Sequence, residues 1–126
     1  MMADGARVLV VDDQEEMRDL LAEMLASEGY EPRAVVGGEE ALQELEHAPY
    51  DLLLTDLNMP HMDGLALLRR VRERWPSLPV VIITGYGSRS TERHVMREGA
   101  QGYISKPCTL QRVIASVSAA LAAPAV

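Results

Sequence analysis

Short apolar runs alternate with segments of helical periodicity along the chain, and this alternation constrains its fold more than any other feature. Five runs have the composition of strands, at residues 7–11, 31–36, 50–56, 80–84 and 102–105. The first, third and fourth runs are dominated by valine, leucine and isoleucine, which is typical of parallel strands that are buried on both faces.

Between and after these runs, apolar residues recur three or four positions apart, which predicts helices. The first such stripe consists of Met17, Leu20, Leu21, Met24 and Leu25. Gly29 follows it, where a helix would end. Four further helices are predicted at 39–47, 65–75, 89–98 and 110–121. The helix at 89–98 has a thin apolar stripe, mainly Val95 and Met96, which indicates weak anchorage.

Strict alternation of strands and helices predicts one α/β domain, with a doubly wound parallel sheet covered by helices on both faces. Right-handed crossovers bring the carboxyl ends of all strands to one edge, where open α/β sheets bind ligands. The 126 residues suffice for one such domain and not for two. We expect its core at about 7–121, with flexible ends at 1–6 and 122–126.

Composition limits the classes of partner. Lys and Arg number 12 against 19 Asp and Glu, a formal net charge of −7, which disfavours direct binding to nucleic acid because that binding relies on cations. The single cysteine, Cys108, excludes an internal disulfide and suits a reducing compartment. No apolar run reaches the roughly 18 residues of a membrane span. The start of the chain lacks the apolar core of a signal peptide. We therefore expect a cytoplasmic protein.

Polar residues stand where the strong strands end. Asp12 and Asp13 follow the first strand, Asp56 ends the third, Thr84 ends the fourth, and Lys106 follows the fifth. The fold predicts that these residues meet at one edge. Three clustered carboxylates repel one another and need a cation, and oxygen-only ligands suit Mg²⁺. With a hydroxyl and an ammonium nearby, the site is suited to a carboxylate that attacks phosphorus.

These residues carry a family resemblance. The acid pair is followed by "DLNMPHMDG" from Asp56, "TGYG" from Thr84 and "KP" from Lys106, in that order. From about Arg7 to Leu121 the chain resembles the receiver domain of bacterial two-component response regulators. The resemblance implies a flavodoxin-like (βα)₅ fold with strand order 2-1-3-4-5, and a phosphorylation-dependent signalling switch that dephosphorylates itself and turns over no external substrate.

The resemblance also implies roles for matching residues. Asp56 would accept a phosphoryl group from a histidine kinase or a phosphotransfer protein. The carboxylates of Asp13 and Asp56 and the backbone carbonyl of Asn58 would bind Mg²⁺, with Asp12 acting through a metal-bound water. Lys106 would pair with the phosphoryl group.

Other matching residues would carry the switch and shape the site. Thr84 would hydrogen-bond to the phosphoryl group and move, and Tyr103 would swing inward as it does. The Lys106–Pro107 bond would be cis, which proline makes accessible. Gly85 would leave room for phosphate entry. The family often has Phe at the position of Cys108, so we expect different packing under the final helix.

The signal would leave through the face made by the fourth helix, the fifth strand and the fifth helix, toward an attached output domain, an effector protein or a second copy of the chain. Arg89, Arg93 and Arg97 form one ridge on the fourth helix. This ridge is either a solvated face or a contact for an acidic partner.

Three alternative interpretations remain open from the sequence. Asp13, with Glu16 three residues later, fits a helix cap. An aspartate-based phosphohydrolase would also attack phosphorus from a strand end, but Asn58 stands where such an enzyme carries an acid and cannot protonate a leaving group. A degenerate receiver that only docks would lack an acid, the acceptor or the lysine, and none is missing.

Overall fold

The computed structural model describes residues 5–122 and has five strands and five helices in the expected alternation. The strands are β1 (Arg7–Val11), β2 (Glu31–Val35), β3 (Leu52–Asp56), β4 (Val80–Thr84) and β5 (Gly102–Ser105). The helices are α1 (Glu15–Ser27), α2 (Gly38–His47), α3 (Gly64–Arg74), α4 (Arg89–Arg97) and α5 (Leu110–Ala122). Most of the ends for which the sequence predicts flexibility, 1–4 and 123–126, lie outside the described residues.

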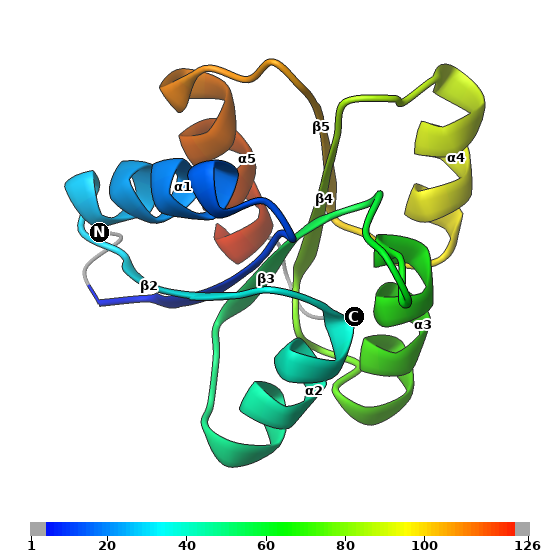
Figure 1. Cartoon of the computed structure of the whole chain (residues 1–126), viewed down its shortest axis with the longest axis horizontal. Coiled ribbons are helices and arrows are strands. Elements are labelled where there is room, and N and C mark those ends of the chain that lie inside the picture. The colour runs from blue at the N-terminus through cyan, green and yellow to red at the C-terminus, as the bar shows by residue number, and fades with distance from the viewer. Residues whose placement is uncertain (1–4, 123–126) are drawn as a thin grey trace.

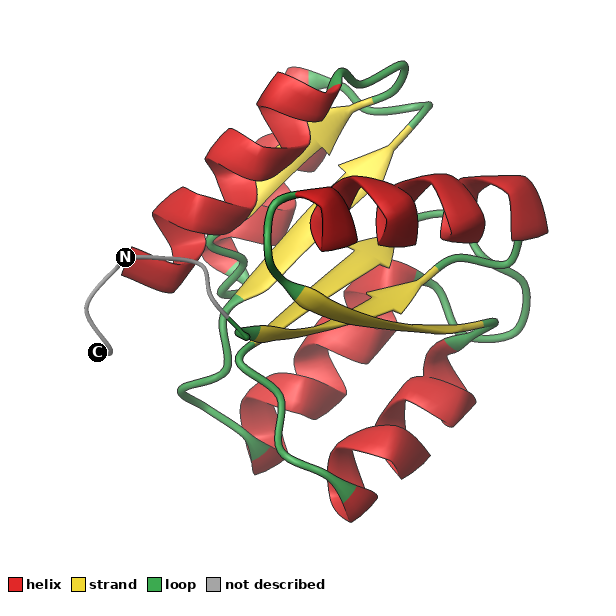
Figure 2. Ribbon diagram, turned by 90° about the vertical axis from the view of Figure 1, so that its left-hand side faces the viewer, coloured by secondary structure: helices red, strands yellow, loops and turns green. Residues whose placement is uncertain are grey.

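The strands form one parallel sheet in the order β2-β1-β3-β4-β5, which confirms the predicted flavodoxin-like topology. Figure 2 shows this twisted sheet as a layer between helices on both sides. Asp56 is the last residue of β3 and Thr84 the last of β4, while Asp12 and Lys106 directly follow β1 and β5. Because neighbouring strands run in the same direction, these four residues share one edge of the sheet.

Two apolar layers hold the sheet in place. Helices α1 and α5 cover one face, and α2, α3 and α4 cover the other (Figure 1). Alternate residues of β1 point into opposite apolar layers. Val8 and Val10 pack with α1 and α5, and Leu9 and Val11 pack with the other helices. Each such fully buried side chain stabilises the fold by about 1.5–3 kcal/mol. The central strands are therefore a rigid base for the residues at their ends.

Some element boundaries differ from prediction by one or two residues. β3 begins at Leu52 and not at residue 50. The Tyr50 hydroxyl donates to Glu44 Oε2 over 2.6 Å. Asp51 Oδ2 accepts the backbone N–H of Arg7 over 2.7 Å. These contacts join the segment just before β3 to α2 and to the start of β1.

The apolar stripes of two helices are narrower than the sequence predicts. In α1, Leu21 and Leu25 are fully buried, but Leu20 is 41% exposed. In α4, Val95 is buried, whereas Met96 is 40% exposed. Both helices pack through one side only, and α4 contributes a single buried residue. The thin apolar stripe predicted for α4 is thus confirmed, and its weak anchorage stays a prediction.

The two ends of α4 are held differently. At its carboxyl end, Glu98 Oε1 lies 3.1 Å from Arg69 Nε. The guanidinium of Arg72 donates to the carbonyl of Gly99 over 2.7 and 3.0 Å. At its amino end, α4 carries only a local cap from the Ser88 side chain. The carboxyl end is therefore fixed to α3, while the amino end is joined to the loop after β4.

Within residues 5–122, no helix combines the length and the apolar character that crossing a membrane requires.

Candidate functional site

Three carboxylates converge at the carboxyl edge of the sheet. One oxygen from each of Asp12, Asp13 and Asp56 lies within 4.8 Å of the other two. Asp12 is fully buried and Asp56 is 5% exposed, whereas Asp13 faces solvent. β1 and β3 are hydrogen-bonded neighbours, which is how residues distant in sequence come together.

The ammonium of Lys106 faces these acids from beyond β5. Its Nζ lies 3.4 Å from Asp12 Oδ2 and 3.5 Å from Asp56 Oδ1. Lys106 is the only lysine in the chain. Its backbone N–H donates to the carbonyl of Thr84 over 2.7 Å, and the Lys106–Pro107 peptide bond is cis. The charged end of Lys106 therefore bridges a fully buried acid and the acid that ends β3.

The site is short of positive charge. Burial raises the pKa of the Asp56 carboxyl above its ordinary value, and the neighbouring Asp12 raises it further, while Lys106 acts in the opposite direction. One ammonium does not balance three carboxylates, so repulsion between them remains. Oxygen-only donors with one solvent-facing member suit a hard cation. The acidic triad is consistent with a metal site.

The chain after β3 is placed by Gly64, the first residue of α3. A Cβ on Gly64 would lie 2.5 Å from the carbonyl oxygen of Asp56, so only glycine lets the helix begin this close to the strand end. Asp63 caps the same helix, because its side chain accepts the backbone N–H of Ala66 over 2.8 Å. The Asp-Gly pair thus fixes the loop that carries Asp56 and Asn58.

Thr84 is fully buried and linked to that loop. Its hydroxyl donates to Asn58 Oδ1 over 2.7 Å and accepts the backbone N–H of Tyr86 over 3.1 Å. The contact of the Asn58 side chain was missed by sequence reasoning, which assigned a role only to the backbone carbonyl of Asn58. No local pattern indicates it, because the two partners come from different loops.

Tyr103 already points inward. Its hydroxyl oxygen is buried and has no hydrogen-bond partner among the described residues. It lies against Gly87, next to the methyl group of Thr84. The sequence predicts that this ring moves inward with Thr84, and the structure presents the inward position.

The cap interpretation of Asp13 is wrong. Helix α1 begins at Glu15 after Gln14, which makes no side-chain cap bond. It is Asp12 that orders this turn, since its Oδ1 accepts the backbone N–H of Gln14 over 2.9 Å. The guanidinium of Arg18 also donates to the backbone carbonyl of Asp12 over 2.9 Å, a contact that the sequence did not reveal. Asp13 is left facing the other two acids.

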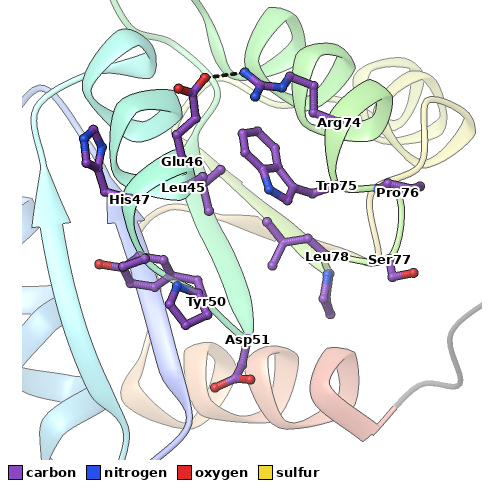
Figure 3. A pocket seen from close by; sticks show the side chains of 13 residues that line it. Leu45, Glu46, His47, Tyr50, Asp51, Arg74, Trp75, Pro76, Ser77 and Leu78 are labelled. Carbon is purple, nitrogen blue, oxygen red and sulfur yellow. Dashed lines mark hydrogen bonds and ion pairs between the residues drawn. The ribbon is translucent and has the colours of Figure 1, made fainter.

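A cavity of about 760 Å³ lies at the opposite edge of the sheet, between the ends of α2 and α3. Figure 3 shows its apolar walls, with Leu45, Trp75 and Leu78, and the ion pair of Glu46 with Arg74 at its rim. It holds no cluster of acids, and it is remote from the carboxyl ends of the strands. We therefore place the candidate site at the acidic triad.

Comparison with known proteins decides the family. A family model for the response regulator receiver domain matches residues 8–118. The chain belongs to this family. The receiver domain of NtrX from Brucella abortus superimposes with a TM-score of 0.88 at 36% identity, covering 93% of this chain and 99% of that one.

Longer relatives contain a similar receiver domain as one part. The response regulator FleR of Pseudomonas aeruginosa is 41% identical over 103 residues, which cover 82% of this chain and 22% of FleR. The DNA-binding transcriptional regulator NtrC of Escherichia coli is 37% identical over 114 residues, which cover 90% of this chain and 24% of NtrC. The chain thus spans about a quarter of the length of these relatives.

Family membership excludes two of the alternative interpretations. A receiver domain is a signalling module that phosphorylation switches, and not a turnover enzyme, so the phosphohydrolase interpretation is wrong. A degenerate, docking-only receiver would lack part of the site, whereas here the acidic triad and Lys106 stand together.

Cys108 follows the cis peptide bond and packs against the layer of α1 and α5. It is half-buried, and burial raises the pKa of its thiol, which disfavours the reactive thiolate. Its surroundings fit the predicted role as a small packing residue without chemistry.

Proposed function

We propose that Asp56 accepts a phosphoryl group from a histidine kinase or a phosphotransfer protein. The observation that carries the proposal is the position of its carboxylate, which closes the acidic triad on one side and meets Lys106 on the other. One carboxylate oxygen is thus near a cation while the cluster keeps an open side at Asp13. A nucleophile needs this combination of held geometry and access.

The charge of Lys106 gives it two tasks. Before phosphorylation it favours the ionised, nucleophilic form of Asp56 against the burial and the Asp12 charge that oppose it. Afterwards the same ammonium is positioned to pair with phosphoryl oxygens, because charge-assisted hydrogen bonds are about twice as strong as neutral ones. Both tasks follow from the position of the ammonium, 3.5 Å from Asp56 Oδ1.

We infer that the resident cation is Mg²⁺. The carboxylates of Asp13 and Asp56 and the backbone carbonyl of Asn58 would hold it, with Asp12 acting through a water molecule. When bound, the cation neutralises carboxylate repulsion and stabilises charge on the phosphoryl oxygens. The buried position of Asp12 and the exposed position of Asp13 support this division, since only Asp13 offers an open face.

The switch rests on the hydroxyl of Thr84. That hydroxyl is engaged with Asn58 and with the N–H of Tyr86, so a bond to a phosphoryl oxygen would compete with its present partners. A ligand shifts a two-state equilibrium only through its differential interaction with the two states. Rearrangement of Thr84 would therefore reposition the loop after β4 and the ring of Tyr103.

The output face consists of α4, β5 and α5. The fixed carboxyl end of α4 and its weakly held amino end support a tilt of the helix about Gly99. Arg89, Arg93 and Arg97 are exposed and form no ion pair within residues 5–122. An acidic partner surface or a second copy of the chain would bind these arginines differently after the helix has tilted.

The pathway would be that of a cytoplasmic two-component regulator. The name of NtrC describes a DNA-binding transcriptional regulator, and this chain matches only a quarter of it. By analogy, an attached output domain or a separate effector protein would supply the response. The receiver itself, with a net charge of −7, would not contact nucleic acid.

Phosphorylation of the intact chain tests the proposal. The protein is incubated with Mg²⁺ and acetyl phosphate, and its intact mass is measured. We expect one added phosphoryl group in the parent and none in Asp56→Asn, which keeps the size of the side chain. Undiminished labelling of Asp56→Asn would overturn the assignment.

A further inference from the structure

The loop after β4 contains two glycines whose surroundings differ sharply. A Cβ on Gly87 would lie 1.7 Å from the Tyr103 hydroxyl oxygen and 2.8 Å from the Thr84 methyl carbon. A Cβ on Gly85 would meet only Lys106 carbons, at 3.8 and 3.9 Å, which is ordinary contact. Gly87 is therefore the point where the two switch residues touch the same loop residue.

Space, and not backbone conformation, is what requires glycine at residue 87. Positive φ angles occur at Gly5, Gly29 and Gly99 among the described glycines, and Gly87 is not one of them. Another L-residue is thus compatible with the backbone of the loop. Its side chain would overlap the inward Tyr103 ring most severely, at 1.7 Å from the hydroxyl oxygen, and would also crowd the Thr84 methyl carbon at 2.8 Å.

The inward position also carries a cost for the ring. The Tyr103 hydroxyl oxygen is buried and makes no well-formed hydrogen bond among residues 5–122, although the nearby backbone N–H of Ser88 acts to lower the pKa of the hydroxyl against the effect of burial. A buried polar group that loses its bonds to water without gaining a replacement destabilises that arrangement. The ring itself packs against the apolar layer of α2, α3 and α4, which favours the same arrangement. The two contributions oppose each other.

We propose that Gly87 is the positioning residue that makes room for the inward Tyr103 ring, and that the poorly hydrogen-bonded hydroxyl weakens this inward state. This inference rests on the proposed switch roles of Thr84 and Tyr103. It adds Gly87 to the switch, and it predicts that two substitutions change the population of the inward ring position in opposite directions. Gly87→Ala fills this room and drives the ring outward, whereas Tyr103→Phe removes the poorly hydrogen-bonded hydroxyl and favours the inward state.

The test uses proton contacts between the residue 103 ring and the Thr84 methyl group, measured by nuclear Overhauser spectroscopy on the full chain with beryllofluoride and Mg²⁺. We expect the contact in the parent and a loss of about tenfold or more in Gly87→Ala, as steric overlap implies. Gly85→Ala is the control in the same loop and should keep the contact when it is compared at matched beryllofluoride occupancy, since residue 85 borders Lys106. Without beryllofluoride, Tyr103→Phe should strengthen it by about fivefold or more.

Two readouts separate this inference from the proposed function. Phosphoryl uptake from acetyl phosphate, followed by intact mass, should persist in Gly87→Ala, because the atoms nearest to a Cβ at this position belong to Tyr103 and Thr84 and not to the acids or Lys106. Loss of uptake in the parent would overturn the proposed function. Normal phosphoryl uptake together with an unchanged ring-to-methyl contact in Gly87→Ala would overturn this inference and leave the proposed function standing. A weakened contact in Tyr103→Phe would also overturn this inference.

Discussion

Removal of the Lys106 charge should destabilise the fold in a manner that depends on pH and on metal. Lys106→Met keeps most of the aliphatic side chain and removes the ammonium. Asp12 and Asp56 are then left buried beside each other without their cation. Packing contacts of the aliphatic part of the side chain are kept in this variant, so any loss of stability reports the removal of the charge.

The magnitude follows from the distances. At an effective dielectric constant of about 20, unit charges 3.4 Å apart attract by about 5 kcal/mol before desolvation is counted. Breaking a buried pair by removing one partner costs about 3–5 kcal/mol. Lys106 is 18% exposed and its contacts are longer than a tight charge-assisted bond. We therefore expect a loss of about 2–3 kcal/mol at pH 8.

The sign of the pH dependence follows from Asp56. Its pKa in the folded state is raised, so the folded protein binds its proton more tightly than the unfolded chain does. The resulting destabilisation is full above the raised pKa and disappears as pH falls toward the unfolded value of about 3.9. Without Lys106 that pKa rises further. The loss in Lys106→Met should therefore shrink as pH falls from 8 to 5.

Urea unfolding measures this effect. At a usual slope of 1–3 kcal/mol per molar urea, the midpoint of Lys106→Met should fall by roughly 1–2 M at pH 8 without metal. Millimolar Mg²⁺ should restore part of the loss by binding the folded state. Arg112→Met, which removes an exposed cation of α5, is the control for net charge. An equal loss at pH 5 and pH 8, insensitive to Mg²⁺, would refute this reasoning.

Three further predictions follow from the same contacts. Asp13→Ala should abolish the Mg²⁺-dependent rise in melting temperature, and a full response in that variant would remove Asp13 from the metal site. Thr84→Ala should still accept phosphate on Asp56 but show a smaller phosphorylation-dependent change in amide exchange over residues 89–103; equal changes at matched occupancy would contradict its coupling role. Arg72→Ala, which removes the donors to Gly99, should lower stability by about 1–3 kcal/mol and raise amide exchange at the carboxyl end of α4. If amide exchange instead increased only at the amino end of α4, Arg72 would not be what holds the carboxyl end of the helix.

Much of the fold and the main chemical residues could be predicted because they depend on local pattern and chain topology. The apolar run at Val80–Thr84 is typical of a central parallel strand. Right-handed crossovers then bring the carboxyl ends of the strands to one edge of the sheet. From that alignment alone, Asp12, Asp56 and Lys106 meet. Their identities, acids and one ammonium, then indicate phosphoryl chemistry.

The details that could not be predicted depend on side chains from distant segments. The bond between Thr84 and Asn58 joins two loops whose relative position is set only by the folded sheet. The inward position of Tyr103 depends on the missing side chain of Gly87, which in sequence resembles any loop glycine. Exposure of Leu20 likewise reflects how narrowly α1 contacts the sheet, and periodicity alone overestimates that contact.

The most direct test of the central claim is to locate the phosphoryl group on the chain. An acyl phosphate on aspartate is reduced by borohydride, which converts that residue into homoserine. The protein is phosphorylated with acetyl phosphate and Mg²⁺, reduced, digested and sequenced by mass spectrometry. We predict homoserine at position 56 and unchanged aspartate at positions 12 and 13. Homoserine at position 12 or 13 with intact Asp56 would contradict the account.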